Sequence, residues 1–303
     1  MLLPLILTAG LLTAPGTAVR EYVALGDSWS ADVTITGIVT DHAPSGCAQS
    51  SWNYPKQVAR ALRVPVFRDA TCGAATTAHM TREQEVNHLP PFVAGVNRPQ
   101  FDRLRATTDL VTLGIGGNDA GLATAAAGCV NLLPSLQIVP GLAPPAPLGA
   151  SCKAKWVTPE GDGMSARIRA AEPAVAKVVD GIRKRSPRAR VLLVNYLAGL
   201  PQSGGCYPYV QANDIDLEWL GDKLEELNHM LARVARAKRV TMVDTYTTSI
   251  GHDVCQLPKV RWVEGVLPFT TDPPGPAVPL HPNRLGAGHQ ARRVLEVLQE
   301  GQL

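Results

Sequence analysis

The sequence has 303 residues, of which 45% are hydrophobic and 18% are charged, so the chain can bury a sizeable core and is not intrinsically disordered. Its net charge of +3 is spread along the chain without a block of lysine or arginine, and only 5% of the residues are aromatic. These features give no support to a nucleic-acid partner.

Residues 1–18 contain no charged side chain and end in the small residues Gly16, Thr17 and Ala18, which is typical of a signal peptide, although a basic beginning is missing. No later segment reaches the roughly 18 unbroken apolar residues of a transmembrane helix. We therefore expect a mature protein, residues 19–303, that is secreted, forms a single domain, does not insert stably into a membrane and is a monomer.

The next element in the chain is the apolar run Tyr22–Leu25, which stops abruptly at Gly26-Asp27-Ser28. We interpret it as a strand that ends in a sharp turn and delivers the hydroxyl of Ser28 to the carboxyl end of a sheet, where ligands gather in open α/β folds. The alternative is a tight turn whose Asp or Ser caps the following helix.

Four further runs have the composition of strands, and four amphipathic segments lie among them. The expected strands are 64–70, 109–115, 190–196 and 240–244, and the expected helices are 54–62, 164–184, 214–237 and 284–299. Pro173 should kink or interrupt the second helix, and Asn283 is a plausible N-cap of the last. The alternation predicts a three-layer α/β/α sandwich with a five-stranded parallel sheet in one domain.

Two longer segments lack periodicity. Residues 134–150 are rich in Pro, Ala and Gly, which indicates a surface loop, either a flap near the site or a disordered bulge. Residues 245–280 are also irregular, and they lead into His281.

The six cysteines indicate an exported protein with three disulfides, since no Cys or His cluster has the spacing of a metal site. The sequence allows fifteen pairings. We expect Cys47–Cys72, Cys129–Cys152 and Cys206–Cys255, because each pair would then close a loop-rich insertion beside a strand end. Buried free thiols are the alternative.

Hydrolysis through a serine needs a base within hydrogen-bond reach and donors for the oxygen that becomes negative. Ser28 would attack, and His281 would take and return the proton. The oxyanion would be held by the N–H groups of Ser28 and Gly73 and by the side-chain amide of Asn118, because two further strands end at Gly73 and at Gly116-Gly117-Asn118.

In these residues the sequence resembles the GDSL or SGNH hydrolases. Gly26-Asp27-Ser28, Gly73, Gly116–Asp119 and His281 look like the family's four ordered blocks. The stretch 47–55 and the six cysteines are similar to secreted actinobacterial lipases and esterases. The resemblance implies a flavodoxin-like sheet, consecutive disulfides, and ester hydrolysis that needs no metal and no other cofactor.

The group that orients His281 is the point of departure from the family. Many members have an aspartate three residues before the histidine, whereas this chain has Val278 there. We expect the backbone carbonyl of Val278 to orient the imidazole, as a main-chain carbonyl does in some members, with Asp272 as the rival.

Other candidates have weaker support. Asp27 and Asp119 are expected to bond backbone N–H groups in their turns, and His252 is a reserve base. The sequence therefore predicts a secreted esterase or lipase for a small-molecule or lipid ester. The alternatives are a carbohydrate O-deacetylase and a catalytically silent binding protein of the same fold.

Overall fold

The computed structural model describes residues 18–86, 94–131, 149–207, 209–265, 269–271 and 274–300. The expected signal peptide up to residue 17, most of the predicted loop 134–150, and Asp272 lie outside the described residues.

A five-stranded parallel sheet forms the centre of the molecule. Its strands are β1 (Glu21–Gly26), β2 (Val66–Asp69), β5 (Leu110–Gly114), β8 (Arg190–Val194) and β9 (Thr241–Val243), in the order β2-β1-β5-β8-β9. Each neighbouring pair is parallel. In order of sequence this is 2-1-3-4-5, the flavodoxin-like arrangement. The predicted fold class is confirmed.

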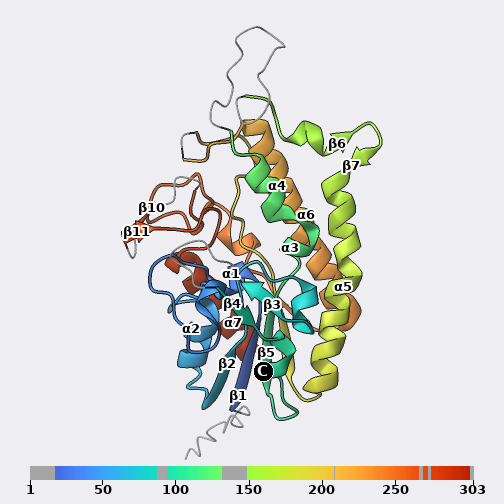
Figure 1. Cartoon of the computed structure of the whole chain (residues 1–303), viewed down its shortest axis with the longest axis vertical. Coiled ribbons are helices and arrows are strands. Elements are labelled where there is room, and N and C mark those ends of the chain that lie inside the picture. The colour runs from blue at the N-terminus through green and yellow to red at the C-terminus, as the bar shows by residue number, and fades with distance from the viewer. Residues whose placement is uncertain are drawn as a thin grey trace, which may run out of the picture.

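Helices cover both faces of the sheet, as Figure 1 shows. The helices α2 (Tyr54–Ala61) and α7 (Arg284–Glu300) pack together on one face, and the long helices α5 (Gly163–Arg185) and α6 (Asp214–Lys238) stand side by side on the other. Alternate strand residues point to opposite layers. Val23, Leu25 and Leu113 belong to the core beneath α5 and α6, whereas Tyr22 and Ala24 belong to the core beneath α2 and α7.

Several short elements were not predicted. Three are helices, α1 (Ser28–Ala31), α3 (Gly117–Ala120) and α4 (Leu122–Gly128). Six short strands pair as antiparallel hairpins, β3 (Gln84–Val86) with β4 (Gly95–Asn97), β6 (Val157–Thr158) with β7 (Gly161–Asp162), and β10 (Phe269–Thr271) with β11 (Pro274–Pro276). Single 3₁₀ turns lie at Ser45–Cys47, Thr77–Met80, Gln100–Arg103, Lys153–Lys155 and Thr247–Ser249.

Pro173 does not interrupt its helix, so that part of the expectation was wrong. Helix α5 runs continuously from Gly163 to Arg185 with Pro173 inside it. Pro173 and Arg169, whose carbonyl loses its helical donor to the proline, are both exposed, so water can satisfy the unpaired carbonyl.

The structure joins the cysteines in the consecutive pairs expected from the sequence, Cys47–Cys72, Cys129–Cys152 and Cys206–Cys255. The first bridge lies beside the end of β1, because the N–H of Cys72 donates to the carbonyl of Gly26 at 3.1 Å. Within the described part of the chain, no helix is long and apolar enough to cross a membrane.

Candidate active site

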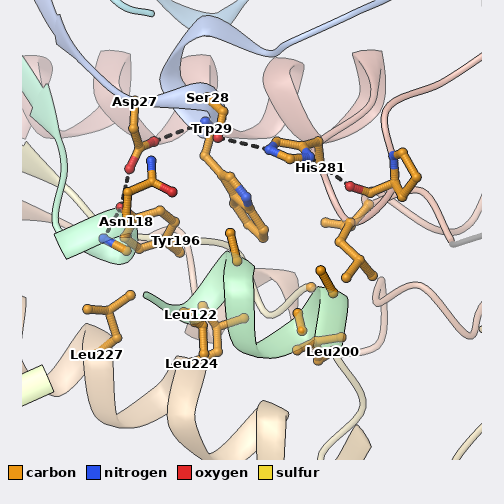
Figure 2. Close-up of a pocket in the computed structure, with 18 of the residues that line it drawn as sticks. Asp27, Ser28, Trp29, Asn118, Leu122, Tyr196, Leu200, Leu224, Leu227 and His281 are labelled. Atoms are coloured by element: carbon orange, nitrogen blue, oxygen red, sulfur yellow. Dashed lines mark hydrogen bonds between the residues drawn. The ribbon is translucent and has the colours of Figure 1, made fainter. Parts of the chain in front are cut away.

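The carboxyl ends of three neighbouring strands bring the candidate residues together. Ser28 follows β1, Asn118 follows β5 and Tyr196 follows β8, and His281 approaches from the loop before α7. Figure 2 shows their side chains around one cavity. Parallel strands end at one edge of the sheet, which is why residues so distant in sequence converge here.

The turn that carries Ser28 is fixed by its neighbour Asp27. The Asp27 carboxylate caps the short helix α1 by accepting the Trp29 N–H at 3.0 Å, and the Asp27 N–H donates to the carbonyl of Gly114 at 3.0 Å. A Cβ at Gly26 would lie 2.5 Å from the Ser30 hydroxyl, so only glycine allows this bend. The tight turn with an Asp cap, which is the alternative interpretation of Gly26-Asp27-Ser28, is therefore present, and it holds Ser28 in place.

His281 lies within hydrogen-bond reach of Ser28. Its Nε2 is 2.8 Å from Ser28 Oγ, and its Nδ1 is 2.7 Å from the backbone carbonyl of Pro279. An Nδ1–H donated to that carbonyl fixes the tautomer in which Nε2 accepts the serine proton.

The carbonyl that orients His281 belongs to Pro279, so the expectation of Val278 was wrong. Leu280 has a φ of 58°, in the left-handed region, and this turn directs the carbonyl of Pro279 back onto the ring two residues later. The side chain of Val278 packs against the small cluster formed by Ala31, Val33 and Ala48. Asp272, the rival, lies outside the described residues.

A backbone pairing holds the histidine segment. The Glu264 N–H donates to the carbonyl of His281 at 3.0 Å, and the Leu280 N–H donates to the carbonyl of Glu264 at 2.8 Å. Asn283 caps α7 by accepting the N–H groups of Leu285 and Gly286, as predicted, and its amide donates to Glu264 at 2.8 Å. The backbone is thus held just before and just after His281 in the chain.

Burial lowers the pKa of His281 from its ordinary value to about 4, and the hydrogen bond to Pro279 opposes that shift only in part. The Trp29 ring system lies nearby, tilted against the imidazole, with the two ring centroids 6.4 Å apart. At neutral pH the imidazole is therefore uncharged, which is the form that can accept a proton.

The structure places the expected oxyanion donors unequally. The N–H of Ser28 has no hydrogen-bond partner within the described residues, and Asn118 spends one of its two amide protons on the carbonyl of Ala75 at 2.9 Å. The N–H of Gly73, in contrast, donates to the carbonyl of Cys47 at 3.0 Å. Neither Gly73 nor Ala74 is among the residues that line the cavity. The N–H of Gly73 is already donated to Cys47, so it is not available as a donor here.

Ala74, which the sequence did not single out, has a free N–H instead. Its φ of 59° lies in the left-handed region, which is rare for alanine, and no described residue accepts its N–H. The segment is bonded to Gly26 through Cys72 and to Asn118 through Ala75, so Ala74 lies between the serine turn and the asparagine. The family motif favours Gly73 as the oxyanion donor, and only the backbone conformation distinguishes Gly73 from Ala74 in this respect.

Tyr196 is a second residue that sequence reasoning missed. Its hydroxyl donates a short hydrogen bond to Asp27 and accepts the N–H of Gly117 at 2.9 Å. Burial raises the pKa of Asp27 to about 7, and the bond from Tyr196 opposes this shift. Tyr196 therefore ties the serine turn to the turn that carries Asn118. No local signal marks it, because its partners are remote in sequence.

The remaining sequence candidates have other roles. Asp119 has a structural role, as expected, but the backbone N–H that it accepts at 3.1 Å belongs to Thr77 and not to its own turn. His252, the reserve base, stacks on Trp262 with the two ring centroids 3.7 Å apart and does not line the cavity. Among the described residues, no group of His, Cys, Asp or Glu side chains could hold a metal ion.

The cavity beside Ser28 has a volume of about 300 Å³. Asp27, Ser28, Asn118, Tyr196 and His281 lie at one end of it, and Figure 2 shows Leu122, Leu224, Leu227 and Leu200 across from Ser28 and His281. The arrangement combines a nucleophile, a neutral base and free donors with an apolar space, which suits acyl transfer.

Comparison with known proteins agrees with this chemistry. Residues 24–291 match the model of the GDSL-like lipase/acylhydrolase family. The chain is 34% identical over 296 residues to Lipase 2 of Streptomyces coelicolor, which covers 96% of this chain and 90% of that protein. It is 28% identical over 245 residues to a lipase of Streptomyces rimosus, covering 80% of this chain and 76% of that one.

Two solved structures are similar in fold. The extracellular lipase from Streptomyces rimosus superposes with a TM-score of 0.67 at 24% identity, covering 93% of this chain and 99% of that one. Phospholipase A1 from Streptomyces albidoflavus superposes with a TM-score of 0.64 at 22% identity, covering 92% and 99%.

Proposed function

This chain belongs to the GDSL-like lipase/acylhydrolase family and is a carboxylic ester hydrolase, and from that premise we propose that Ser28 is its nucleophile and His281 its general base. The observation that carries the proposal is the 2.8 Å contact between His281 Nε2 and Ser28 Oγ. The free energy of activation falls because one difficult step is divided into two through an acyl-enzyme.

In the first step Ser28 Oγ attacks the ester carbonyl while its proton moves to His281 Nε2. The tetrahedral intermediate then collapses, and His281 returns the proton to the leaving alcohol. A water molecule next attacks the acyl-enzyme with His281 again as the base, and the acid leaves. The carbonyl of Pro279 keeps the ring in the required orientation throughout.

The negative oxygen of the intermediate is held by the N–H of Ser28, by the second amide proton of Asn118, and by the N–H of Ala74 in place of Gly73. Each such donor is typically worth roughly 3 kcal/mol of transition-state stabilisation. Their support is that each has an N–H without an acceptor among the described residues.

The protein acts outside the cytoplasm in this proposal. Residues 1–18 would be removed as a signal peptide, leaving a single monomeric domain from residue 19 onward that needs no cofactor. Three disulfides support this compartment, because they persist in oxidising surroundings.

The replacement Ser28→Ala tests the nucleophile. Hydrolysis of p-nitrophenyl acetate should fall by at least 10³-fold, because removing a member of a catalytic set that acts as a unit typically costs on the order of 10⁴-fold or more. The matched control is Ser30→Ala, which deletes a buried hydroxyl two residues away whose Oγ bonds the carbonyl of Gly114 at 3.4 Å.

The control should keep most of the activity, and circular dichroism should show both variants folded. If folded Ser28→Ala retains more than a few per cent of the wild-type rate, another residue is the nucleophile.

A further inference from the structure

The cavity beside Ser28 has polar groups at one end only. Ser28, Asn118 and His281 lie there, and the hydroxyl of Tyr196 is occupied by Asp27 and Gly117. Beyond them the cavity wall is apolar. A substrate atom that enters this part meets almost no hydrogen-bond partner, so the space suits a hydrocarbon.

Helix α4 forms one wall of that space. Leu122, Ala123, Ala126 and Ala127 recur at helical spacing and face the cavity. Helix α4 follows directly after α3, which carries Asn118, so it begins beside the catalytic residues and runs away from them. Its alanines leave room that larger side chains would fill, and Leu224 and Leu227 of α6 close the wall opposite Ser28.

The other wall depends on Trp29. Its ring projects into the cavity between Ser28 and the leucines, as Figure 2 shows, and packs edge-on against Tyr196 with ring centroids 5.4 Å apart. A Cβ at Gly199 would lie 2.8 Å from the tip of Trp29, so the glycine is what admits this ring. Trp29 thus gives the cavity a rigid apolar side next to Ser28.

A second, smaller hollow adjoins the first. The two share Ala126, Val130, Leu200 and Leu280 in their linings, and the smaller one continues to Leu217 and Leu220 of α6. Leu200 and Ala126 therefore lie where an occupant of the main cavity would pass into the smaller one.

We propose that this cavity holds the acyl chain of a medium-chain fatty ester, lying along α4 and away from Ser28, and that Ala126 and Leu200 set the length it accepts. The proposal rests on the proposed function, because it takes Ser28 as the point at which the acyl carbonyl is held. The leaving alcohol departs on the side of His281, which must protonate it.

The size of the cavity sets the preferred chain. A volume of about 300 Å³ holds roughly ten groups of the size of water, at ~30 Å³ each, so an acyl chain of roughly eight to ten carbons fills it. Each added methylene should raise kcat/KM by roughly fourfold while it gains buried surface. The gain should end once the cavity is full.

An acetylated carbohydrate fits the same cavity poorly. An acetyl group would leave most of the apolar space empty, and a sugar placed in that space would bury hydroxyl groups against side chains that cannot form hydrogen bonds. Between the two ester classes, the lining therefore favours a fatty acyl chain.

The test compares kcat/KM for p-nitrophenyl esters of two, four, eight, ten and sixteen carbons. Ala126→Phe should lower the ratio of octanoate to acetate at least tenfold, with Ala126→Leu lowering it less. Leu200→Ala should move the optimum to longer chains by opening the smaller hollow. Thr124→Phe is the matched control, because Thr124 is exposed on the same helix and does not line the cavity.

The expected result is a wild-type optimum near eight to ten carbons, an unchanged profile in Thr124→Phe, and opposite shifts in the two sets of cavity variants. A wild-type enzyme that prefers acetate, or an Ala126→Leu profile that matches the control, overturns the proposal. Failure of the proposed function can be distinguished from failure of this proposal. If Ser28 were not the nucleophile, Ser28→Ala would still hydrolyse the acetate ester.

Discussion

At the scale of single residues, the proposed chemistry depends on an imidazole held by a carbonyl. A carbonyl fixes the tautomer of His281 as a carboxylate would, but it supplies no negative charge to stabilise the imidazolium that forms during attack. Burial also disfavours that charged form. His281 is consequently a weaker base than a histidine paired with aspartate, and one that stays neutral in mildly acidic solution.

The pH profile of kcat/KM should therefore extend further into acid than that of an ordinary histidine enzyme. The base works only when neutral, so activity is lost as the pH falls through its pKa, which burial lowers to about 4. At pH 5.5 the rate with p-nitrophenyl acetate should remain near its neutral value. A histidine with the usual pKa of about 6.5 would have lost roughly nine-tenths of its activity there.

This experiment needs a control that shows the protein is still folded at acidic pH. His281 is neutral in the folded protein but takes up a proton near pH 6.5 when unfolded, so it contributes a loss of stability as the pH falls from about 6.5 to 4. Circular dichroism at pH 5.5, and recovery of full activity on return to pH 7, separate unfolding from titration. An acid limb centred near 6.5 in folded protein would show that burial does not set this pKa.

Residue identity alone could predict Ser28, Asn118 and His281, because each lies in a motif whose chemistry requires that residue type. It could not predict the carbonyl of Pro279, which accepts from His281, or the N–H of Ala74, which we propose as a donor. Both are backbone groups, directed by a left-handed φ at Ala74 itself and at Leu280. Such conformations are rare outside glycine, so a sequence reading places the donor on Gly73 and the acceptor on Val278 instead.

At the scale of elements, Tyr196 connects three strand ends. It follows β8, donates to Asp27 after β1 and accepts from Gly117 after β5. A Cβ at Gly117 would lie 3.0 Å from its hydroxyl, which shows how closely the two turns approach. The bond fixes the distance between the turn that carries Ser28 and the helix that carries Asn118.

Tyr196→Phe should lower kcat by about tenfold and change KM by less than about threefold. The reason is that loss of the hydroxyl leaves the Oδ2 of Asp27 and the N–H of Gly117 unpaired, which loosens the oxyanion donors without shrinking the acyl cavity. The matched control is Tyr22→Phe. It removes a hydroxyl equally buried in the sheet, bonded to Thr112 at 2.7 Å and absent from the cavity lining.

Both variants should lose a similar amount of thermal stability, about 1–3 kcal/mol each. If kcat falls equally in both, Tyr196 acts through general stability and has no positioning role.

Elements with a strong period could be predicted from the sequence, and elements without one could not. The buried apolar runs of β1, β5 and β8 and the apolar stripe of α6 can be recognised in the sequence even where their exact ends cannot. Helix α4 consists mainly of Ala and Gly between Leu122 and Gly128, so it has no apolar contrast to detect. The proposed role of α4 in the acyl cavity follows from its position in the cavity wall and not from its sequence pattern.

At the scale of the whole molecule, a parallel sheet explains why the site could be anticipated at all. Because all five strands end at one edge, three motifs separated by large distances in sequence had to meet there. The same logic does not extend to the cavity. Its volume depends on how Trp29, Gly199 and the leucines of α6 pack, and that packing is a property of the assembled fold.

The most direct measurement of the catalytic claim is the mass of the wild-type protein after reaction with a fluorophosphonate, followed by peptide mapping. Ser28 beside neutral His281 should form one covalent adduct, found on the peptide that contains Ser28. An adduct on any other residue, or none on folded protein, would contradict the assignment of Ser28 as the nucleophile.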